Sequence, residues 1–228
     1  MWNVTGDTHG QFDSVIEWAK SHQGETLIIL GDAGINYSGG ARDLGVKLAL
    51  DNLGIDIVCI HGNHENRPTN IKGYVEVDYL GGKAYIEEEF PHLIFAKDGE
   101  VYDFGGTKAL VIGGAYSIDK EYRLINGWKW FKDEQPSDEI KKSVEDKIKA
   151  LGGKVDIVLT HTCPLKYEPT EWFMSGINQD NVDKTTEKWL DKIEESLDYK
   201  KWYCGHYHGE KVIDKLEFLY GSIKELES

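Results

Sequence analysis

One local pattern recurs along this chain and limits what it can fold into. A short apolar run, rich in Val, Ile, Leu, Trp or Tyr, is followed at once by a cluster of Gly, Asp, His or Asn. The pattern occurs five times: WNVT precedes GDTHG, TLIIL precedes GDAG, DIVCI precedes HGNHE, DIVLT precedes HTCP, and KWYC precedes GHYH. Such short, apolar runs are typical of buried β-strands. The sequence therefore predicts five buried strands that each end in polar side chains.

The segments between the first three runs have the spacing of helices. Residues 11–23 and 41–53 carry apolar side chains at helical intervals. A strand-helix-strand-helix-strand order requires parallel strands. Ligands of such sheets gather beyond the carboxyl ends of the strands, so we expect all five polar clusters to meet at one rim.

The remaining segments predict a second sheet and two more helices. Residues 100–117 have the pattern of a hairpin around two glycines, and residues 210–222 have the pattern of another. These hairpins indicate a second sheet that is mainly antiparallel. Helices are predicted at 137–153, where Ser137 is the expected N-cap, and at 181–197.

The length and composition are those of one ordinary globular domain. The chain has 228 residues, of which 40% are hydrophobic, enough for a sizeable core. We therefore expect an α/β fold over residues 1–228, a two-sheet sandwich flanked by helices. Three cysteines without disulfide or metal-site spacing fit a reducing compartment. A signal-peptide pattern and a run of roughly 18 apolar residues are both missing, so we expect a cytoplasmic protein.

The charge balance limits the possible partners. The formal net charge is −14, which disfavours an anionic membrane or a long nucleic acid as partner. A phosphate-containing substrate would then need local cations. The only arginines are Arg42, Arg67 and Arg123, so a bidentate phosphate contact must come from one of them or be absent. Arg67, three residues after His64, and Arg123 are the candidates for substrate binding.

The five polar clusters together supply carboxylates, imidazoles and one amide. Their members are Asp7, His9, Asp32, Asn63, His64, His161, His206 and His208. So many polar groups at one rim would repel each other or lose hydrogen bonds unless cations bound them. There are enough ligands for two metal ions, and oxygen and nitrogen donors without thiolate suit Mn, Fe or Zn. The identity of the metal remains open.

In their order and spacing, the motifs GDTHG, GDAG, GNHE, HT and GHYH resemble the calcineurin-like metallophosphoesterase superfamily, and the similarity spans residues 6–208. The resemblance implies two divalent transition-metal ions. Their implied ligands are Asp7, His9 and His208 for one ion, Asn63, His161 and His206 for the other, and Asp32 as the bridge. His64, the remaining histidine, would then be the general acid for the leaving alkoxide.

The resemblance implies an enzyme that hydrolyses phosphomonoesters by in-line attack of a metal-bound hydroxide on phosphorus. An alternative is a phosphodiesterase acting on small nucleotides, such as cyclic nucleotides or dinucleotides. A non-catalytic metal-binding interaction module is the third interpretation. It is disfavoured because every ligand position and the acid histidine are filled.

Two features separate this chain from the protein-phosphatase branch of the superfamily. That branch carries GDxxDRG, whereas this chain has GDAGINY, with Ile35 and Asn36 at the positions of the acid and its neighbour. Another group must therefore orient His64. The second feature is the long aromatic segment 113–139, which directly follows a predicted strand and is expected to shape substrate choice.

Overall fold

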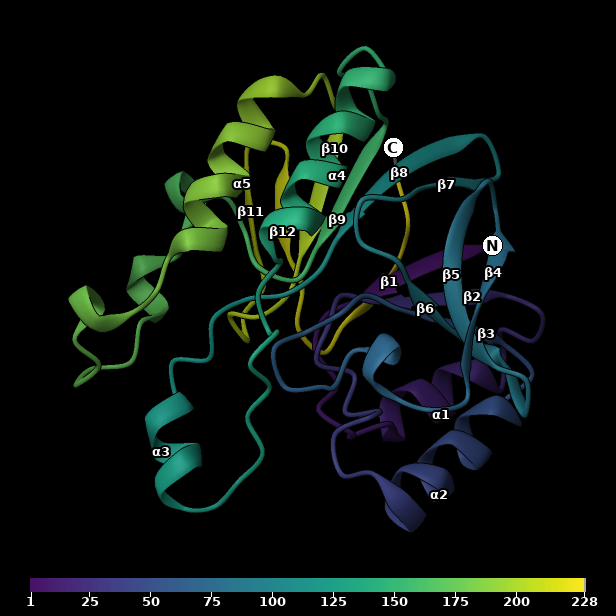
Figure 1. The fold of residues 1–228 in the computed structure, drawn as a ribbon. Helices are drawn as coiled ribbons and strands as arrows, with labels where there is room; N and C mark the ends of the chain where they lie inside the picture. The colour runs from purple at the N-terminus through teal and green to yellow at the C-terminus, as the bar shows by residue number, and fades with distance from the viewer. Residues whose placement is uncertain (228) are drawn as a thin grey trace.

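The computed structural model describes residues 1–227 and contains two β-sheets with helices on their outer faces (Figure 1). The first sheet has seven strands, and its central strands β1, β2, β3 and β6 are parallel. The strand β13 runs antiparallel to β1, β5 runs antiparallel to β6, and the edge strand β4 runs antiparallel to β5. In spatial order the strands are β13 (Ile223–Glu225), β1 (Trp2–Thr5), β2 (Thr26–Ile29), β3 (Asp56–Cys59), β6 (Phe90–Ala96), β5 (Gly82–Glu87) and β4 (Tyr74–Tyr79).

The second sheet has six strands, of which the central four, β12, β10, β9 and β8, are parallel. Only the edge strands β11 and β7 run antiparallel to their neighbours. In spatial order the strands are β11 (Lys211–Ile213), β12 (Leu216–Phe218), β10 (Lys201–Cys204), β9 (Ile157–Thr160), β8 (Thr107–Ile112) and β7 (Val101–Phe104). The prediction of a mainly antiparallel second sheet is therefore wrong, because the long connection from β8 to β9 returns the chain parallel to β8.

Each sheet is covered by two helices on its outer face (Figure 1). The helices α1 (Asp13–Ala19) and α2 (Gly40–Asp51) pack on the first sheet, and α4 (Asp138–Ala150) and α5 (Thr185–Ser196) pack on the second. The short helix α3 (Lys120–Ile125) lies within the segment 113–139. Four short 3-10 helices complete the helical elements of residues 1–227: Pro68–Asn70, Leu165–Tyr167, Thr170–Trp172 and Gln179–Asn181.

Alternation along the strands divides the interior into three layers. In β2, Ile28 packs in the core between the two sheets, whereas Leu27 and Ile29 pack against α1 and α2. In β9, Leu159 points into the central core and Val158 faces α4 and α5. Each fully buried aliphatic side chain of this kind contributes on the order of 1.5–3 kcal/mol to stability. The strands are apolar on both faces because both faces are buried.

The predicted α/β sandwich with flanking helices is confirmed. All five apolar runs are strands, and all four predicted helices form, although each is shorter than its predicted range. Ser137 caps α4, because its Oγ accepts a hydrogen bond from the Ile140 backbone N at 3.3 Å. The five runs do not belong to one sheet, however. Three lie in the first sheet and two in the second, so their polar ends meet where the two sheets adjoin.

No helix within residues 1–227 combines the length and the apolar composition that crossing a membrane requires.

Candidate metal centre

Asp7 lies at the centre of the polar clusters. It follows β1, and only 4% of its surface is exposed. The Asp7 Oδ2 atom lies 3.3 Å from His208 Nε2 and 3.6 Å from His9 Nε2, and these two nitrogens are 2.8 Å apart. One carboxylate oxygen and two imidazole nitrogens from opposite ends of the chain therefore converge on one point, where they could hold a metal ion.

A second group of potential ligands shares Asp7 with the first. It consists of Asp7, Asp32 and His161, all buried. The Asp32 Oδ1 atom lies 3.7 Å from His161 Nε2, and Asp7 Oδ1 lies 4.0 Å from His161 Nδ1. The other Asp32 oxygen, Oδ2, faces His9 and lies 3.9 Å from its Nδ1 atom. Asp32 thus directs one oxygen toward each group.

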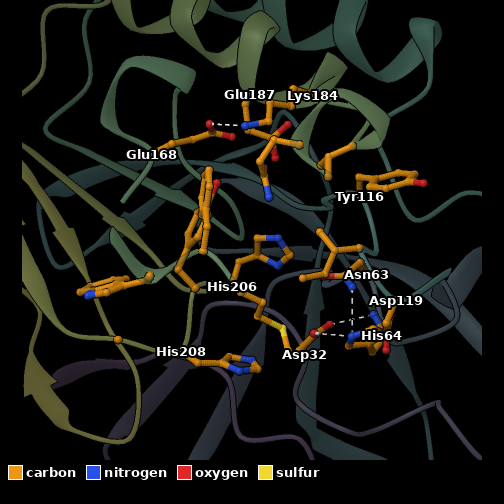
Figure 2. A pocket seen from close by; sticks show the side chains of 18 of the residues that line it. Asp32, Asn63, His64, Tyr116, Asp119, Glu168, Lys184, Glu187, His206 and His208 are labelled. Carbon is orange, nitrogen blue, oxygen red and sulfur yellow. Dashed lines mark hydrogen bonds and ion pairs between the residues drawn. The ribbon is translucent and has the colours of Figure 1, made fainter. Parts of the chain in front are cut away.

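Asn63 and His206 lie beside the second group. The Asn63 Oδ1 atom is 2.8 Å from His161 Nε2, and the His206 ring centroid is 4.9 Å from that of His161. The His206 backbone N also donates a hydrogen bond to Asp7 Oδ1 at 2.8 Å. The structure thus brings together all seven residues predicted as ligands, and Figure 2 shows Asp32, Asn63, His206 and His208 around one end of a cavity.

Backbone conformations at the strand ends aim these side chains. Four of the predicted ligands have left-handed backbone angles, which are uncommon outside glycine: φ is 48° at His9, 46° at Asp32, 68° at His206 and 50° at His208. Each such residue costs on the order of 1–3 kcal/mol. Strain concentrated at the tips of several strands is characteristic of functional sites.

Glycines in the motifs permit close approach to the ligands. A Cβ on Gly205 would lie 2.3 Å from Asp7 Oδ1, and a Cβ on Gly62 would lie 2.1 Å from Asp32 Oδ1. Neither distance is possible for real atoms. The glycine that precedes each of these ligand loops is therefore needed so that the backbone can pass against a carboxylate from another strand.

The donor atoms fit bound cations. Asp7 Oδ2 is buried and has no hydrogen-bond partner, which is costly for an ionised carboxylate. The His161 Nδ1 atom is 2.7 Å from the Leu30 carbonyl oxygen and donates to it, so a neutral His161 presents its lone pair at Nε2. That lone pair faces the Asn63 oxygen, which is also an acceptor. A cation relieves both conflicts, and oxygen and nitrogen donors without thiolate suit divalent transition metals.

The electrostatics keep the donors in their metal-binding forms. Burial alone would raise the pKa of Asp7, but the nearby His161, His208 and His9 rings and the hydrogen bond from the His206 backbone outweigh it and hold the pKa below its ordinary value. Burial lowers the pKa of His206 far below its ordinary value, and His161 lowers it further. An ionised carboxylate and a neutral imidazole are the forms that bind metal.

Two residues that the sequence did not reveal orient Asn63. The Asn63 Nδ2 atom donates to Ser117 Oγ at 2.9 Å, and that hydroxyl donates to Glu134 Oε2 at 2.6 Å. All three side chains are buried. The amide nitrogen is thereby fixed away from the cluster, and Oδ1 is left facing His161. Both supporting residues belong to the segment 113–139.

Replacing Ser117 tests this support. Ser117→Ala removes the buried acceptor at 2.9 Å from the Asn63 amide and leaves only His64 Nε2, at 3.2 Å, beside it, so the Asn63 side chain can turn its nitrogen toward the ligands. We expect divalent-metal affinity to fall by about 10- to 100-fold, the usual effect of losing a partner that orients a ligand. Calorimetric metal titration measures this change. Ser196→Ala, which removes a hydroxyl bonded only to the Ile193 carbonyl in α5, is the matched control and should leave affinity unchanged. Equal metal affinities of the unmodified chain, Ser117→Ala and Ser196→Ala would contradict the role of Ser117 in orienting Asn63.

His64 lies beside the cluster and contacts Arg123. The His64 backbone N donates to Asp32 Oδ1 at 2.8 Å, and its ring Nε2 lies 3.2 Å from Arg123 Nη2. Arg123 is held in turn by Asp119, whose Oδ2 accepts from its Nε at 2.8 Å. Arg123 lies in α3 and Asp119 directly precedes this helix, so the ion pair lies next to His64. The acid that the protein-phosphatase motif would place near His64 is replaced by Ile35 in this chain. The i, i+4 spacing of this pair is the only trace it leaves in the sequence.

Arg67, the other predicted phosphate-binding residue, is engaged elsewhere. Its Nη1 donates to Asp98 Oδ2 at 2.6 Å and its Nε donates to the Asp133 carbonyl at 2.9 Å. It lines neither of the two cavities that adjoin His64. These contacts are typical of a structural ion pair. They do not support a role for Arg67 in phosphate binding.

Comparison with known proteins agrees with this geometry. A family model described as calcineurin-like phosphoesterase matches residues 3–210. The chain belongs to this family. It is accordingly a metal-dependent hydrolase acting on phosphoester bonds, as the sequence motifs implied.

A solved structure has the same fold as this phosphoesterase. The crystal structure of TT1561 from Thermus thermophilus matches with a TM-score of 0.51 and 14% identity, over 96% of this chain and 87% of that one. No match was found among curated proteins.

Two cavities of this phosphoesterase meet at His64. The larger, of about 850 Å³, extends from Asp32 and His208 toward Glu187, as Figure 2 shows. The smaller, of about 270 Å³, is lined by Arg42 and Arg123. The His64 side chain lines both. A phosphoester bound at the metal ligands would therefore have a basic recess on one side and a large open cavity on the other.

Glu187 is an unusual carboxyl group in the larger cavity. Only 4% of its surface is exposed, its Oε1 accepts from Thr162 Oγ1 at 2.9 Å, and its Oε2 has no hydrogen-bond partner. Burial raises the pKa of Glu187 from 4.5 to about 7, and the hydrogen bond from Thr162 only partly opposes this shift.

This raised pKa predicts a measurable dependence of stability on pH. Between about pH 4.5 and pH 7 the unfolded chain releases the Glu187 proton while the folded chain keeps it, so stability falls as pH rises through this window. Glu187→Gln removes the ionisable group and therefore this loss of stability with rising pH. Relative to the unmodified chain, the variant should gain on the order of 2 kcal/mol of unfolding free energy between about pH 5 and about pH 8.

Urea unfolding of the chelator-treated chain at the two pH values measures this gain. Glu217→Gln is the control, because Lys201 and Lys224 lower the pKa of Glu217 against its burial, so its stability contribution changes mainly below this pH window. The control should change stability by almost the same amount at each pH. A Glu187→Gln variant that behaves like the control would contradict a raised pKa at this position.

Proposed function

We propose that this chain is a phosphomonoesterase that uses two divalent transition-metal ions, of Mn, Fe or Zn. The observation that carries the proposal is the pair of ligand groups that share Asp7, with Asp32 directing one oxygen toward each. Two such ions, when bound, supply positive charge to the phosphate oxygens and acidify a water molecule. A phosphoryl transfer of this kind needs positioning and charge stabilisation rather than a covalent nucleophile.

The seven ligands are assigned to the two ions as the sequence motifs imply. Asp7, His9 and His208 would hold one ion, Asn63, His161 and His206 the other, and Asp32 would bridge them. The bridging role is supported by the position of Asp32 between the two rings: its Oδ2 lies 3.9 Å from His9 Nδ1, and its Oδ1 lies 3.7 Å from His161 Nε2. The three cysteines are left without a role, since all are buried and burial raises each thiol pKa.

His64 and Arg123 have complementary roles in this proposal. The guanidinium of Arg123 and the Asn63 amide nitrogen both lie 3.2 Å from His64 Nε2, and for Nε2 to carry a proton Arg123 would turn to the phosphate oxygens and the Asn63 amide would donate to Ser117 alone. Burial lowers the pKa of His64 and Arg123 adds to this effect, whereas Asp32 opposes it. An imidazolium with a lowered pKa gives its proton readily to a leaving alkoxide, which is the role we assign to His64.

The two cavities favour a monoester over a diester. A monoester has one organic group, which the larger cavity accommodates, while its phosphate oxygens face the recess with Arg42 and Arg123. A diester would have to place its second organic group in that small basic recess. The net charge of −14 also disfavours long nucleic acids as substrates.

Metal removal and a matched pair of substrates test the proposal. The chelator-treated chain should hydrolyse neither p-nitrophenyl phosphate nor bis(p-nitrophenyl) phosphate, and Mn, Fe or Zn should restore activity, with the monoester preferred. Activity that does not depend on added metal would refute a metal mechanism. Restored activity with the diester preferred would refute the monoester assignment and support the phosphodiesterase alternative.

Replacement of His64 separates acid catalysis from metal binding. His64→Gln should retain the metals and lose about 10²- to 10⁴-fold of kcat on an alkyl phosphate, whose leaving group needs a proton. The loss on p-nitrophenyl phosphate should be much smaller. His92→Gln, at an exposed histidine paired with Asp56, is the control. Equal losses on both substrates would show that His64 only positions the phosphate, and loss of metal would return it to the ligand set.

A further inference from the structure

The larger cavity is far bigger than a phosphate group requires. Its volume of about 850 Å³ lies in the range of sites that enclose a whole organic ligand. It begins at Asp32, His64 and His208 and ends at Glu187 (Figure 2). The part of a phosphoester that leaves with the alcohol would therefore lie inside it.

The walls of the cavity are mainly aromatic and aliphatic. Tyr116 and Ile118 come from the segment 113–139, and the opposite wall comes from the segment 168–184. That wall includes Trp172, Phe173, Met174 and Val182. An apolar lining of this kind favours a flat, apolar ligand group.

Trp172 is fixed in place by its neighbours. Its ring packs edge-on against Phe218, with centroids 5.6 Å apart. It also lies directly against Gly209, the residue that follows His208, because a Cβ there would be 2.7 Å from the ring. The glycine at the end of GHYHG thus sets the indole beside the metal ligands. A preorganised indole binds a ring at little entropic cost.

Glu187 can receive a polar group of the ligand at the far end of the cavity. The unpartnered Oε2 of Glu187 lines it there, and the nearby Lys184 is already paired with Glu168 at 2.6 Å and lies 4.8 Å from the Phe173 ring centroid. A protonated Glu187 could donate a hydrogen bond to an acceptor on the ligand.

The charge around the cavity disfavours a second anionic group. Its lining contains the carboxylates of Asp119, Glu168 and Glu210, whereas Lys184 is its only lysine or arginine among the residues described. A second phosphate or a carboxylate in this space would be repelled. Nucleoside polyphosphates and acidic sugars are therefore disfavoured.

We propose that this cavity binds the uncharged, ring-bearing alcohol portion of the phosphomonoester, with the ring against Trp172 and Phe173 and a polar edge toward Glu187. The proposal rests on the phosphomonoesterase function and names its class of substrate: arylmethyl-type and heteroaromatic phosphomonoesters with a single phosphate. The cavity thus selects the leaving group, while Arg123 and the ions that the metal ligands would hold bind the phosphate.

Substrates with leaving alcohols of similar acidity test the preference. We expect kcat/KM for 2-naphthylmethyl phosphate to exceed that for ethyl phosphate by about 10-fold or more, since contacts of this size discriminate by at least that factor. A 4-carboxybenzyl phosphate should be a poorer substrate than benzyl phosphate. A quinolinylmethyl phosphate, which offers an acceptor nitrogen, should equal or exceed the naphthyl compound.

Variants locate the preference in the cavity. Trp172→Ala should lower kcat/KM for 2-naphthylmethyl phosphate by about 10-fold and leave ethyl phosphate within about twofold. Trp18→Ala, at a tryptophan of α1 stacked on His22, should change neither value. Glu187→Leu should abolish any advantage of the quinoline nitrogen, and Glu187→Gln, which keeps a donor, should restore it.

A binding measurement on the metal-free chain separates this proposal from the proposed function. Calorimetry should detect saturable binding of 2-naphthylmethanol, weakened by Trp172→Ala and unchanged by Trp18→Ala. Metal-restored hydrolysis of p-nitrophenyl phosphate without a ring preference or alcohol binding would overturn the cavity assignment and leave the phosphomonoesterase function standing.

A preference for phosphocholine over benzyl phosphate would also overturn the cavity assignment, because the cavity would then select a cation. Loss of all metal-dependent hydrolysis would refute the function itself.

Discussion

The burial of the Asp7 carboxylate is the constraint on which the rest of the site depends. An ionised oxygen without a hydrogen-bond partner is tolerated in a protein interior only if a cation or several donors compensate it. The turn that follows β10 of the second sheet provides the contacts: the His206 backbone N donates to Oδ1, and the His208 ring lies 3.3 Å from Oδ2. Gly205 has no side chain and so leaves room for Asp7 Oδ1. The central claim is that Asp7 and Asp32 together hold two ions between the sheets.

Neither sheet contains a complete site. The first supplies Asp7, Asp32 and Asn63 at the ends of β1, β2 and β3, and the second supplies histidines beyond β9 and β10. The core between the sheets therefore fixes distances among ligands that are up to about two hundred residues apart in the chain. The outer segments add selectivity: 113–139 orients Asn63 and contacts His64, and 168–184 forms the apolar wall.

The sequence predicted the strands that carry ligands, because buried parallel strands are continuous apolar runs and their polar ends stand out. It did not predict the strands of 74–96, where β4 and β5 are half-exposed and β6 contains Pro91 near its start, a residue that argues against a strand. The contacts of Ser117, Asp119 and Glu134 could not be predicted either. Each depends on how a long connection folds back over the site, which local patterns do not encode.

Anomalous X-ray diffraction from crystals soaked in Mn²⁺ tests the central claim most directly. The account predicts two peaks roughly 3.5 to 4 Å apart, the usual separation in two-metal sites. One should be coordinated by Asp7, His9 and His208 and the other by Asn63, His161 and His206, with an oxygen of Asp32 on each. A single peak, or two peaks that do not share Asp32, would contradict the two-metal centre.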